Sequence, residues 1–403
     1  MKRSVQAILV VMFGAALSAS IHQPDAAAQS TSLKQGDELR PIYAKPEDIA
    51  DGKEFAESSC AGCHGANGIS STTGIPDLAG QRPSYLLVKL KEYQTGVRTN
   101  AAMNTSVKFI SDDALVKVAA YYASLDPAQP VPGRAASYID PVQAGKTAAA
   151  ACAGCHGETG VSKMPAIPSL IGQDPQYLAS AMKAYRSGQR KNDTMKSMLA
   201  AVNDADINHL ALFYALQPAG RAQTPATGDA LAGKASTVGC AGCHGDQGVS
   251  GSPATPSLAG QDAQYLVSAL RAYKSGGRAD DTMKALAASV DDSALKDIAA
   301  YYAGLDPHAP NVRLPLSVQE WTQRCDRCHG TNGNSADARI PALAGQRTEY
   351  LQSALHDYQS GVRKNPEMSA MSSALSDEDI KNLATYYSHQ KARAVVFMPV
   401  PGK

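Results

Sequence analysis

Apolar positions in this chain follow the helical period, and no segment alternates convincingly between apolar and polar residues as a half-buried strand would. In residues 376–389 the apolar side chains recur at i, i+3, i+4 and i+7: Ile380, Leu383, Ala384 and Tyr387. Ser376 with Asp379 resembles a capping box at the start of this segment. A second helix is expected over residues 84–95, with Gly96 as its C-terminal stop. The pattern therefore predicts an all-α fold.

The first 28 residues have the pattern of a secretory signal peptide. Lys2 and Arg3 precede an apolar run of 15 residues, 7–21, and an alanine triplet ends the segment at residue 28. The run is short for a membrane span, and an uncleaved N-terminal anchor is the alternative. No later stretch approaches the roughly 20 apolar residues that cross a bilayer. We expect residues 1–28 to be removed, 29–45 to form a linker, and the mature chain to lie in a bacterial periplasm without a transmembrane span.

Charge and aromatic content narrow the classes of function. The 403 residues include 38 Lys+Arg and 37 Asp+Glu, and this balance excludes a strongly basic nucleic-acid binder. The aromatic residues are 17 Tyr, 5 Phe and 1 Trp, so few large apolar side chains are available for a core. We therefore expect another group to supply apolar surface.

All eight cysteines belong to four Cys-x-x-Cys-His-Gly motifs, whose first cysteines are 92, 88 and 85 residues apart. The cysteine pairs are Cys60/Cys63, Cys152/Cys155, Cys240/Cys243 and Cys325/Cys328. The histidines are His64, His156, His244 and His329. Length varies only between the repeats, in proline-rich stretches. We expect four domains, numbered 1 to 4, and a tail: residues 46–126, 140–217, 228–306, 315–391 and 392–403.

Counting forward from each histidine gives a register without a single insertion. Proline lies at +12: Pro76, Pro168, Pro256 and Pro341. Glutamine lies at +17: Gln81, Gln173, Gln261 and Gln346. Tyrosine lies at +21 and +58, the first set being Tyr85, Tyr177, Tyr265 and Tyr350. Arginine lies at +34: Arg98, Arg190, Arg278 and Arg363. Methionine lies at +39: Met103, Met195, Met283 and Met368.

The Cys-x-x-Cys-His motif is the attachment sequence for c-type haem. The two thiols add to the vinyl groups of the haem, and the adjoining histidine can then bind the iron. Half of a zinc site and a disulfide in an oxidising compartment are the alternatives, but neither explains why a histidine follows every pair. The sequence therefore predicts four covalently bound haem c groups, which would also supply the missing apolar surface.

The repeated methionine indicates the second iron ligand. A core methionine is the alternative, because Met commonly fills gaps, and Met198 and Met371 at +42 are rival ligands in two repeats only. His/Met ligation raises the reduction potential and closes the iron to substrate. The +12 proline carbonyl is a suitable acceptor for the second N–H of the histidine, a plain turn proline being the alternative. The +34 arginine suits a haem propionate, a solvated arginine being the alternative.

Each repeat resembles a class I cytochrome c domain, and cytochrome c4 in particular. The resemblance rests on Cys-Ala-Gly-Cys-His-Gly, Ile-Pro-Ser-Leu-Ile-Gly-Gln, Asn-Asp-Thr-Met-Lys-Ser-Met and a Tyr-Tyr end, and it covers about residues 46–391. It implies tandem cytochrome c domains in which the +12 prolines accept from the histidines. Cytochrome c4 has two such domains in a pseudo-twofold pair, whereas this chain has four, and two pairs placed end to end is a hypothesis. Repeat 4 also departs from the others, with Asp326-Arg327 between its cysteines.

The sequence thus predicts a tetrahaem cytochrome that transfers single electrons from a dehydrogenase or quinol-oxidising complex of a respiratory chain towards a terminal acceptor or oxidase. One alternative is a haem enzyme, peroxidase-like or thiosulfate-oxidising, which would need an open iron site. The other is a fixed electron-transfer subunit of a dehydrogenase or oxidase complex. The sequence predicts no catalytic residues and no nucleic-acid partner.

Overall fold

The computed structural model describes residues 36–130 and 136–397, and every helix or strand assigned within these ranges is a helix. The all-α prediction is confirmed for this part of the chain. The predicted signal peptide falls outside the described residues. No helix in the described ranges combines the length and apolar content that a membrane span requires.

Each domain repeats one helical arrangement. Domain 1 contains α1 (Pro46–Ser59), α2 (Ala61–His64), α3 (Pro83–Thr95), α4 (Ala101–Val107) and α5 (Asp112–Ser124). Domain 2 contains α6 (Pro141–Ala149), α7 (Ala153–His156), α8 (Pro175–Ser187), α9 (Asp193–Leu199) and α10 (Asp204–Ala215). Domain 3 contains α11 (Ala230–Ala235), α12 (Val238–His244), α13 (Ala263–Ser275), α14 (Asp281–Ala288) and α15 (Asp292–Gly304). Domain 4 contains α16 (Val318–His329), η2 (Thr331–Gly333), α17 (Thr348–Gln359), α18 (Pro366–Ser372) and α19 (Asp377–Ser388).

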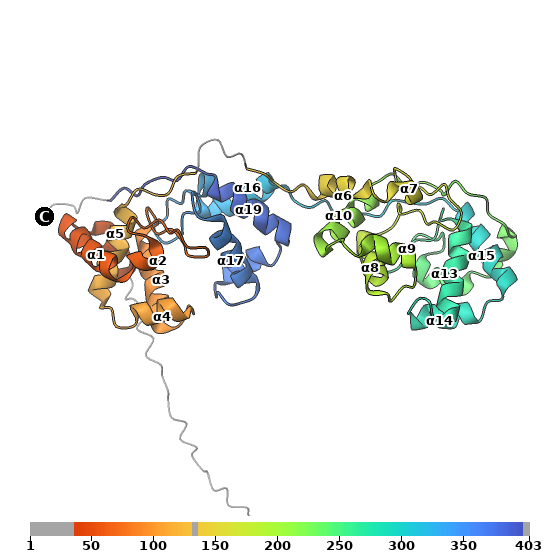
Figure 1. Ribbon diagram of the computed structural model, residues 1–403, viewed down its shortest axis with the longest axis horizontal. Coiled ribbons are helices and arrows are strands. Elements are labelled where there is room, and N and C mark those ends of the chain that lie inside the picture. Colours follow the sequence, from red (N-terminus) through yellow and green to blue (C-terminus); the bar gives the residue numbers. More distant parts are fainter. Residues whose placement is uncertain (1–35, 131–135, 398–403) are drawn as a thin grey trace, which may run out of the picture.

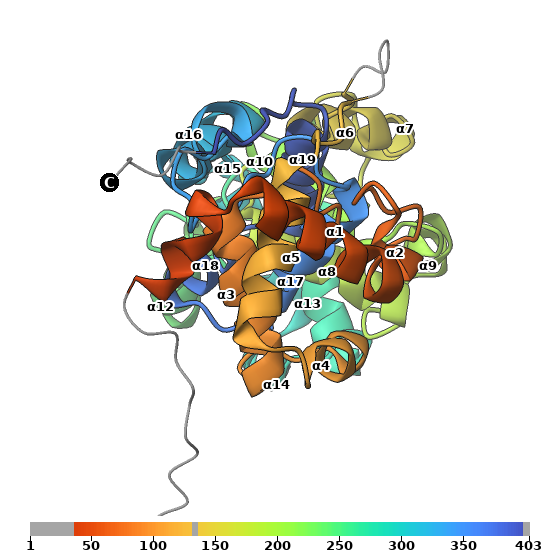
Figure 2. The same cartoon turned by 90° about the vertical axis from the view of Figure 1, so that its left-hand side faces the viewer.

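Local sequence explains where these helices begin and end. In α3 a proline occupies the first turn and Gly96 ends the helix with a left-handed φ of 75°, which glycine adopts without steric cost. Ser376 and Asp379 form the expected capping box at the start of α19. The first and last helices of domain 1 cross closely, because a Cβ on Gly52 of α1 would lie 2.1 Å from the Lys117 carbonyl of α5. Figure 2 shows α1 lying across α5.

The four domains form two pairs, and the pairing is nested. Domain 1 packs against domain 4, and domain 2 packs against domain 3 (Figure 1). We call domains 1 and 4 the outer lobe and domains 2 and 3 the inner lobe. Gln81 Nε2 donates to the Ala342 carbonyl in the outer lobe, and Gln173 Nε2 donates to the Ser257 carbonyl in the inner lobe. The hypothesis of two pairs therefore agrees with the structure, but the partners are not consecutive in the chain.

Two segments outside the expected domains complete the outer lobe. The helix η1 (Asp37–Tyr43), within the linker expected over residues 29–45, packs against α3 and α5. In the expected tail, Val395 and Phe397 pack against the apolar core of domain 1. The chain therefore returns to its first domain after finishing its last, which is consistent with the nested pairing.

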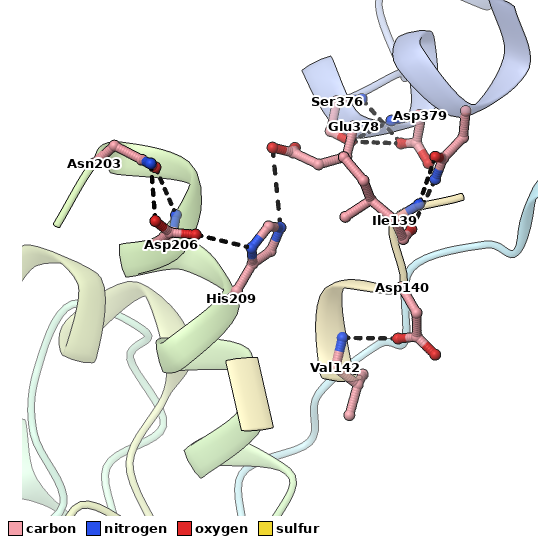
Figure 3. Close-up of polar contacts among 10 residues, drawn as sticks. Ile139, Asp140, Val142, Asn203, Asp206, His209, Ser376, Glu378 and Asp379 are labelled. Carbon is pink, nitrogen blue, oxygen red and sulfur yellow. Dashed lines mark hydrogen bonds and ion pairs between the residues drawn. The ribbon is translucent and has the colours of Figure 1, made fainter. Parts of the chain in front are cut away.

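The two lobes also touch each other (Figure 3). Asn382 of α19 exchanges two hydrogen bonds of 2.8 Å with the backbone of Ile139, just before α6. His209 of α10 is buried and lies between two carboxylates, with Nδ1 3.8 Å from Asp206 and Nε2 3.9 Å from Glu378 of α19. The contact therefore combines a paired backbone segment with one charged triplet.

Candidate haem-attachment sites

The four cysteine pairs lie at the start of, or within, the helix that ends at each histidine. None of the eight cysteines, all in the described ranges, forms a disulfide. The first cysteine of each pair is half-buried and packs against the apolar core of its own domain: Cys60, Cys152, Cys240 and Cys325. Burial raises the pKa of the first thiol in each repeat, that of Cys325 to about 11. The polypeptide itself therefore shelters the first of the two predicted attachment points.

The second cysteine of each pair lies differently from the first. All four predicted haem-attaching residues at this position are exposed rather than enclosed by their domain: Cys63, Cys155, Cys243 and Cys328. The reason is helical geometry, because three residues correspond to about 300° of rotation and place the second thiol about 60° around the helix from the first. The two thiols thus remain neighbours on one turn, but only the first reaches the core. The side chains of the domain do not by themselves build a site around the second thiol, and its attachment to haem stays a prediction.

The glycine after each histidine is required by a close backbone approach. Gly65 has a φ of 82°, and a Cβ there would lie 2.0 Å from the carbonyl oxygen of Ile69. The same approach recurs in the other three repeats. Only glycine allows the chain to turn this sharply after the histidine.

Each motif histidine is buried and donates to the carbonyl of the proline twelve residues later. The Nδ1–O distances are 3.0 Å for His64–Pro76, 2.9 Å for His156–Pro168, 2.8 Å for His244–Pro256 and 3.0 Å for His329–Pro341. A carbonyl only accepts, so Nδ1 carries the hydrogen and Nε2 keeps its lone pair. Burial lowers the pKa of all four rings, although the proline carbonyls oppose this shift. The neutral ring with a free Nε2 lone pair is the form that ligates a metal.

The +39 methionines lie in the first turn of a short helix rather than in an open loop. The residue at +36 caps this helix and accepts from the methionine N–H, as Asn100 does from Met103 at 3.1 Å. The other three repeats have the same cap. All four +39 methionines are partly buried, whereas the rivals Met198 and Met371 are 50% and 38% exposed. The short helix was missed because its 7–8 residues carry no apolar period of useful length.

The +34 arginines gather at the domain interfaces among tyrosines. In the inner lobe, Arg278 Nη2 donates to Tyr265 at 3.1 Å and, across the interface, to Tyr185 at 3.0 Å. In the outer lobe, Arg98 donates across the interface to Tyr350 at 3.4 Å. Within the described ranges only Arg363, of the four arginines, has a carboxylate partner, at 3.1 Å from Asp357. Three largely enclosed guanidiniums without an anion suit the carboxylates of a haem.

Sequence reasoning missed two sets of residues at these sites. One is a tyrosine at +29, whose rings lie under the arginines: Tyr93, Tyr185, Tyr273 and Tyr358. The other is the contact made by the +17 glutamines, which were noted in the register but given no role. Their fixed place in all four repeats was the available signal, but an intact register does not say which domain a side chain faces.

The donor sets do not suit zinc. Among residues 36–130 and 136–397, no group of three or more His, Cys, Asp or Glu side chains converges as a metal site. The unpaired thiols, the neutral histidine and the unpaired guanidiniums instead fit one covalently held haem in each domain.

Comparison with known proteins agrees with this chemistry. Residues 49–126, 142–213 and 226–305 match the family model for cytochrome c. This chain belongs to the cytochrome c family. Residues 318–386 match the model for subunit III of cbb3-type cytochrome c oxidase. The chain is thus a c-type cytochrome of tandem class I, c4-like domains, in which Cys-x-x-Cys-His motifs bind haem c covalently.

Individual relatives cover two domains at a time. The chain is 36% identical to cytochrome c4 of Pseudomonas aeruginosa over 169 residues, 40% of this chain and 84% of the relative. It is 32% identical to a thiosulfate dehydrogenase electron acceptor of Thiomonas intermedia over 172 residues, 40% of this chain and 79% of the relative. The crystal structure of reduced cytochrome c4 from Pseudomonas stutzeri is 27% identical, with a TM-score of 0.38, and covers 42% of this chain and all of that one. The relatives indicate a multihaem electron-transfer cytochrome.

Proposed function

We propose that this cytochrome is a periplasmic tetrahaem carrier that passes single electrons between redox proteins. The observation that carries the proposal is the histidine–proline hydrogen bond, which all four domains form at 2.8–3.0 Å beside an unpaired cysteine pair. No domain has lost the arrangement, as a domain kept only for structure could.

Each haem would be held by one repeat. The cysteine pairs would form the thioethers, the motif histidines and +39 methionines would bind the iron from its two faces, and the +34 arginines would pair with propionates. The haem supplies reversible one-electron chemistry when bound. The protein residues fix the histidine ring through the proline carbonyl, keep it neutral by burial, and exclude water from its Nδ1 side.

The electron donor we propose is a dehydrogenase, and the acceptor is a further redox protein or terminal oxidase. The support is the likeness to relatives named as electron acceptors of thiosulfate dehydrogenase. An enzyme acting at its own iron would need at least one open site, and every domain here offers a partly buried methionine at +39.

Two measurements test the proposal. Haem quantitation on the purified holoprotein should give four covalent haems per chain, and two or fewer would contradict it. Replacing Met283 by Ala should lower the potential of that haem and open its iron to an added ligand such as imidazole, because the thioether favours the reduced state. The matched controls are Met198→Ala and Met371→Ala, which should leave the spectrum unchanged. A spectral change confined to the controls would assign the ligand to +42 in those repeats.

A further inference from the structure

We propose that the +17 glutamine of each domain sets the reduction potential of the haem in the partner domain, acting through a single peptide group. The inference rests on the proposed haem ligation by the motif histidines. It makes the potential of each haem depend on the domain paired with it, and it assigns the glutamines as positioning residues.

The outer lobe shows the connection atom by atom. The peptide group between Pro76 and Asp77 has its carbonyl on Pro76 and its N–H on Asp77. The carbonyl accepts from His64 Nδ1 at 3.0 Å. The N–H donates to Oε1 of Gln346, a residue of domain 4, at 3.0 Å. One peptide of domain 1 therefore links the histidine of domain 1 to the glutamine of domain 4.

The same link exists in all four domains, always across the interface. Gln81 Oε1 of domain 1 accepts from Ala342 N at 2.8 Å, and the preceding carbonyl, on Pro341, accepts from His329. In the inner lobe the N–H groups that follow Pro168 and Pro256 donate to the partner glutamines, Ser169 to Gln261 at 2.7 Å and Ser257 to Gln173 at 3.0 Å. Such fourfold recurrence is not expected of incidental interface contacts.

The glutamines are held rigidly for this role. All four side chains are buried. Gln346 Nε2 donates to the Asp77 carbonyl at 2.9 Å, and Gln346 Oε1 also accepts from its neighbour Arg347 N at 3.0 Å. A reversed amide would place NH2 against two backbone N–H groups, so the hydrogen bonds themselves fix which atom faces the Asp77 N–H.

Polarisation along the chain of hydrogen bonds gives the direction of the effect. A peptide whose N–H is engaged becomes a stronger acceptor at its carbonyl, because successive hydrogen bonds polarise one another. A stronger acceptor draws the Nδ1 hydrogen and makes the ring a more basic iron ligand. Greater basicity favours the oxidised iron. The glutamine of one domain should therefore lower the potential of the haem in the other.

The test uses the full-length holoprotein with Gln346→Leu and, separately, Gln81→Leu. Haem-methyl resonances are assigned to domains through NOEs to side chains of the same domain, and each haem is then followed through a redox titration. Gln346→Leu should raise the potential of the haem in domain 1 and shift the Nδ1–H resonance of His64 upfield. Gln81→Leu should do the same for the haem in domain 4 and His329.

Controls separate this role from general loosening of the lobe. Gln359→Leu removes a glutamine of domain 4 that bonds only its own domain, the carbonyls of Ser372 and Leu375, and should leave the haem of domain 1 unchanged. Gln346→Glu retains an acceptor oxygen at the Asp77 N–H and should restore a potential at or below the wild-type value.

Two outcomes would overturn the inference. One is a shift confined to the haem of the domain that carries the substitution. The other is an equal shift of both haems of the lobe with either leucine variant, which would indicate that the lobe has merely opened. Four covalent haems that titrate reversibly would leave the proposed function standing in either case.

Discussion

The outer and inner lobes share the same reciprocal glutamine contacts but carry opposite charges at the next residue. At +18 the outer lobe has Arg82 and Arg347, whereas the inner lobe has Asp174 and Asp262. The repeats are thus alike where any pair must be bonded and different where one pair must be distinguished from another.

In the outer lobe the arginine meets acceptors of the partner domain. Arg347 Nη1 donates to the Ser70 carbonyl, close to the Asp77 carboxylate, which accepts from Ser70 N at 2.8 Å. Burial raises the pKa of Asp77, and the Ser70 N–H and Arg347 oppose the shift. Arg347 therefore offsets the charge of a carboxylate that has been largely removed from water.

In the inner lobe the aspartate meets donors instead. Asp262 is fully buried and accepts from Ala166 N of domain 2 at 2.9 Å and from Thr224 Oγ1. The residues at the position of Asp77 are serines, Ser169 and Ser257, whose hydroxyls carry no charge. A pairing of domain 1 with domain 3 would bring Asp262 towards Asp77, and two like charges in a buried interface are costly. The +18 charge therefore helps to decide which domains pair.

The largest effect is expected on removing the inner-lobe carboxylate. Asp262→Ala leaves three buried donors without an acceptor, those of Ala166, Thr224 and Tyr265, and should destabilise the inner lobe by about 3 kcal/mol. Calorimetry of the holoprotein should show the transition of one lobe moved to lower temperature and the other unmoved.

The matched control is Asp174→Ala in the same lobe. Asp174 occupies the equivalent position but caps only its own helix, bonding Gln176 N at 2.8 Å. Its loss should cost about 1 kcal/mol, as for an N-cap. Equal losses from the two variants would show that the cross-interface bonds of Asp262 add nothing to the lobe.

A smaller effect, dependent on pH, is expected at Asp77. Its pKa is raised on folding, so the native state binds the proton more tightly than the unfolded state does. Stability from this group is present below the unfolded pKa and is lost as the pH rises through the raised, folded pKa. Asp77→Asn should therefore raise the melting temperature of the outer lobe at pH 7, with the gain shrinking as the pH falls below the unfolded pKa of aspartate.

Thermal melts followed by circular dichroism over pH 3–8 (about the range where aspartate titrates) would measure this gain. Asp262→Asn offers no equivalent test because that carboxylate has three donors. A gain for Asp77→Asn that is constant with pH would place its cause outside the titration of Asp77.

The smallest effect is expected where the lobes meet. Glu378→Gln removes one charge beside His209 at a distance of 3.9 Å and should change stability by less than about 1 kcal/mol. Small-angle X-ray scattering should show a broader range of lobe separations, while both melting transitions stay in place. Glu367→Gln, on the exposed surface of α18, serves as the control. A drop in the melting of the outer lobe itself would contradict a purely inter-lobe role for Glu378.

Much of each domain follows from local sequence. The capping box of Ser376 and Asp379, the stop at Gly96 and the stripe of α19 are short-range features, and they predicted helices at the right places. The cysteine pairs and histidines were likewise found from contiguous residues, although the motif alone did not show that only the first cysteine of each pair packs against the core. The short helix that carries each methionine was missed, because its N-cap at +36 stabilises a segment too brief to show a period.

What the sequence alone determined is the repeating unit: four helical domains, each with a haem-attachment motif and an in-register proline and methionine. What only the tertiary structure decided is which unit faces which. Gln81 bonds Ala342 across 261 residues and Gln346 bonds Asp77 across 269, while the inner glutamines reach 84 and 92 residues. Any two domains offer the same glutamines, so the choice depends on interface charges at +13 and +18 and on the return of the last segment to domain 1. Those contacts exist only after the chain has folded.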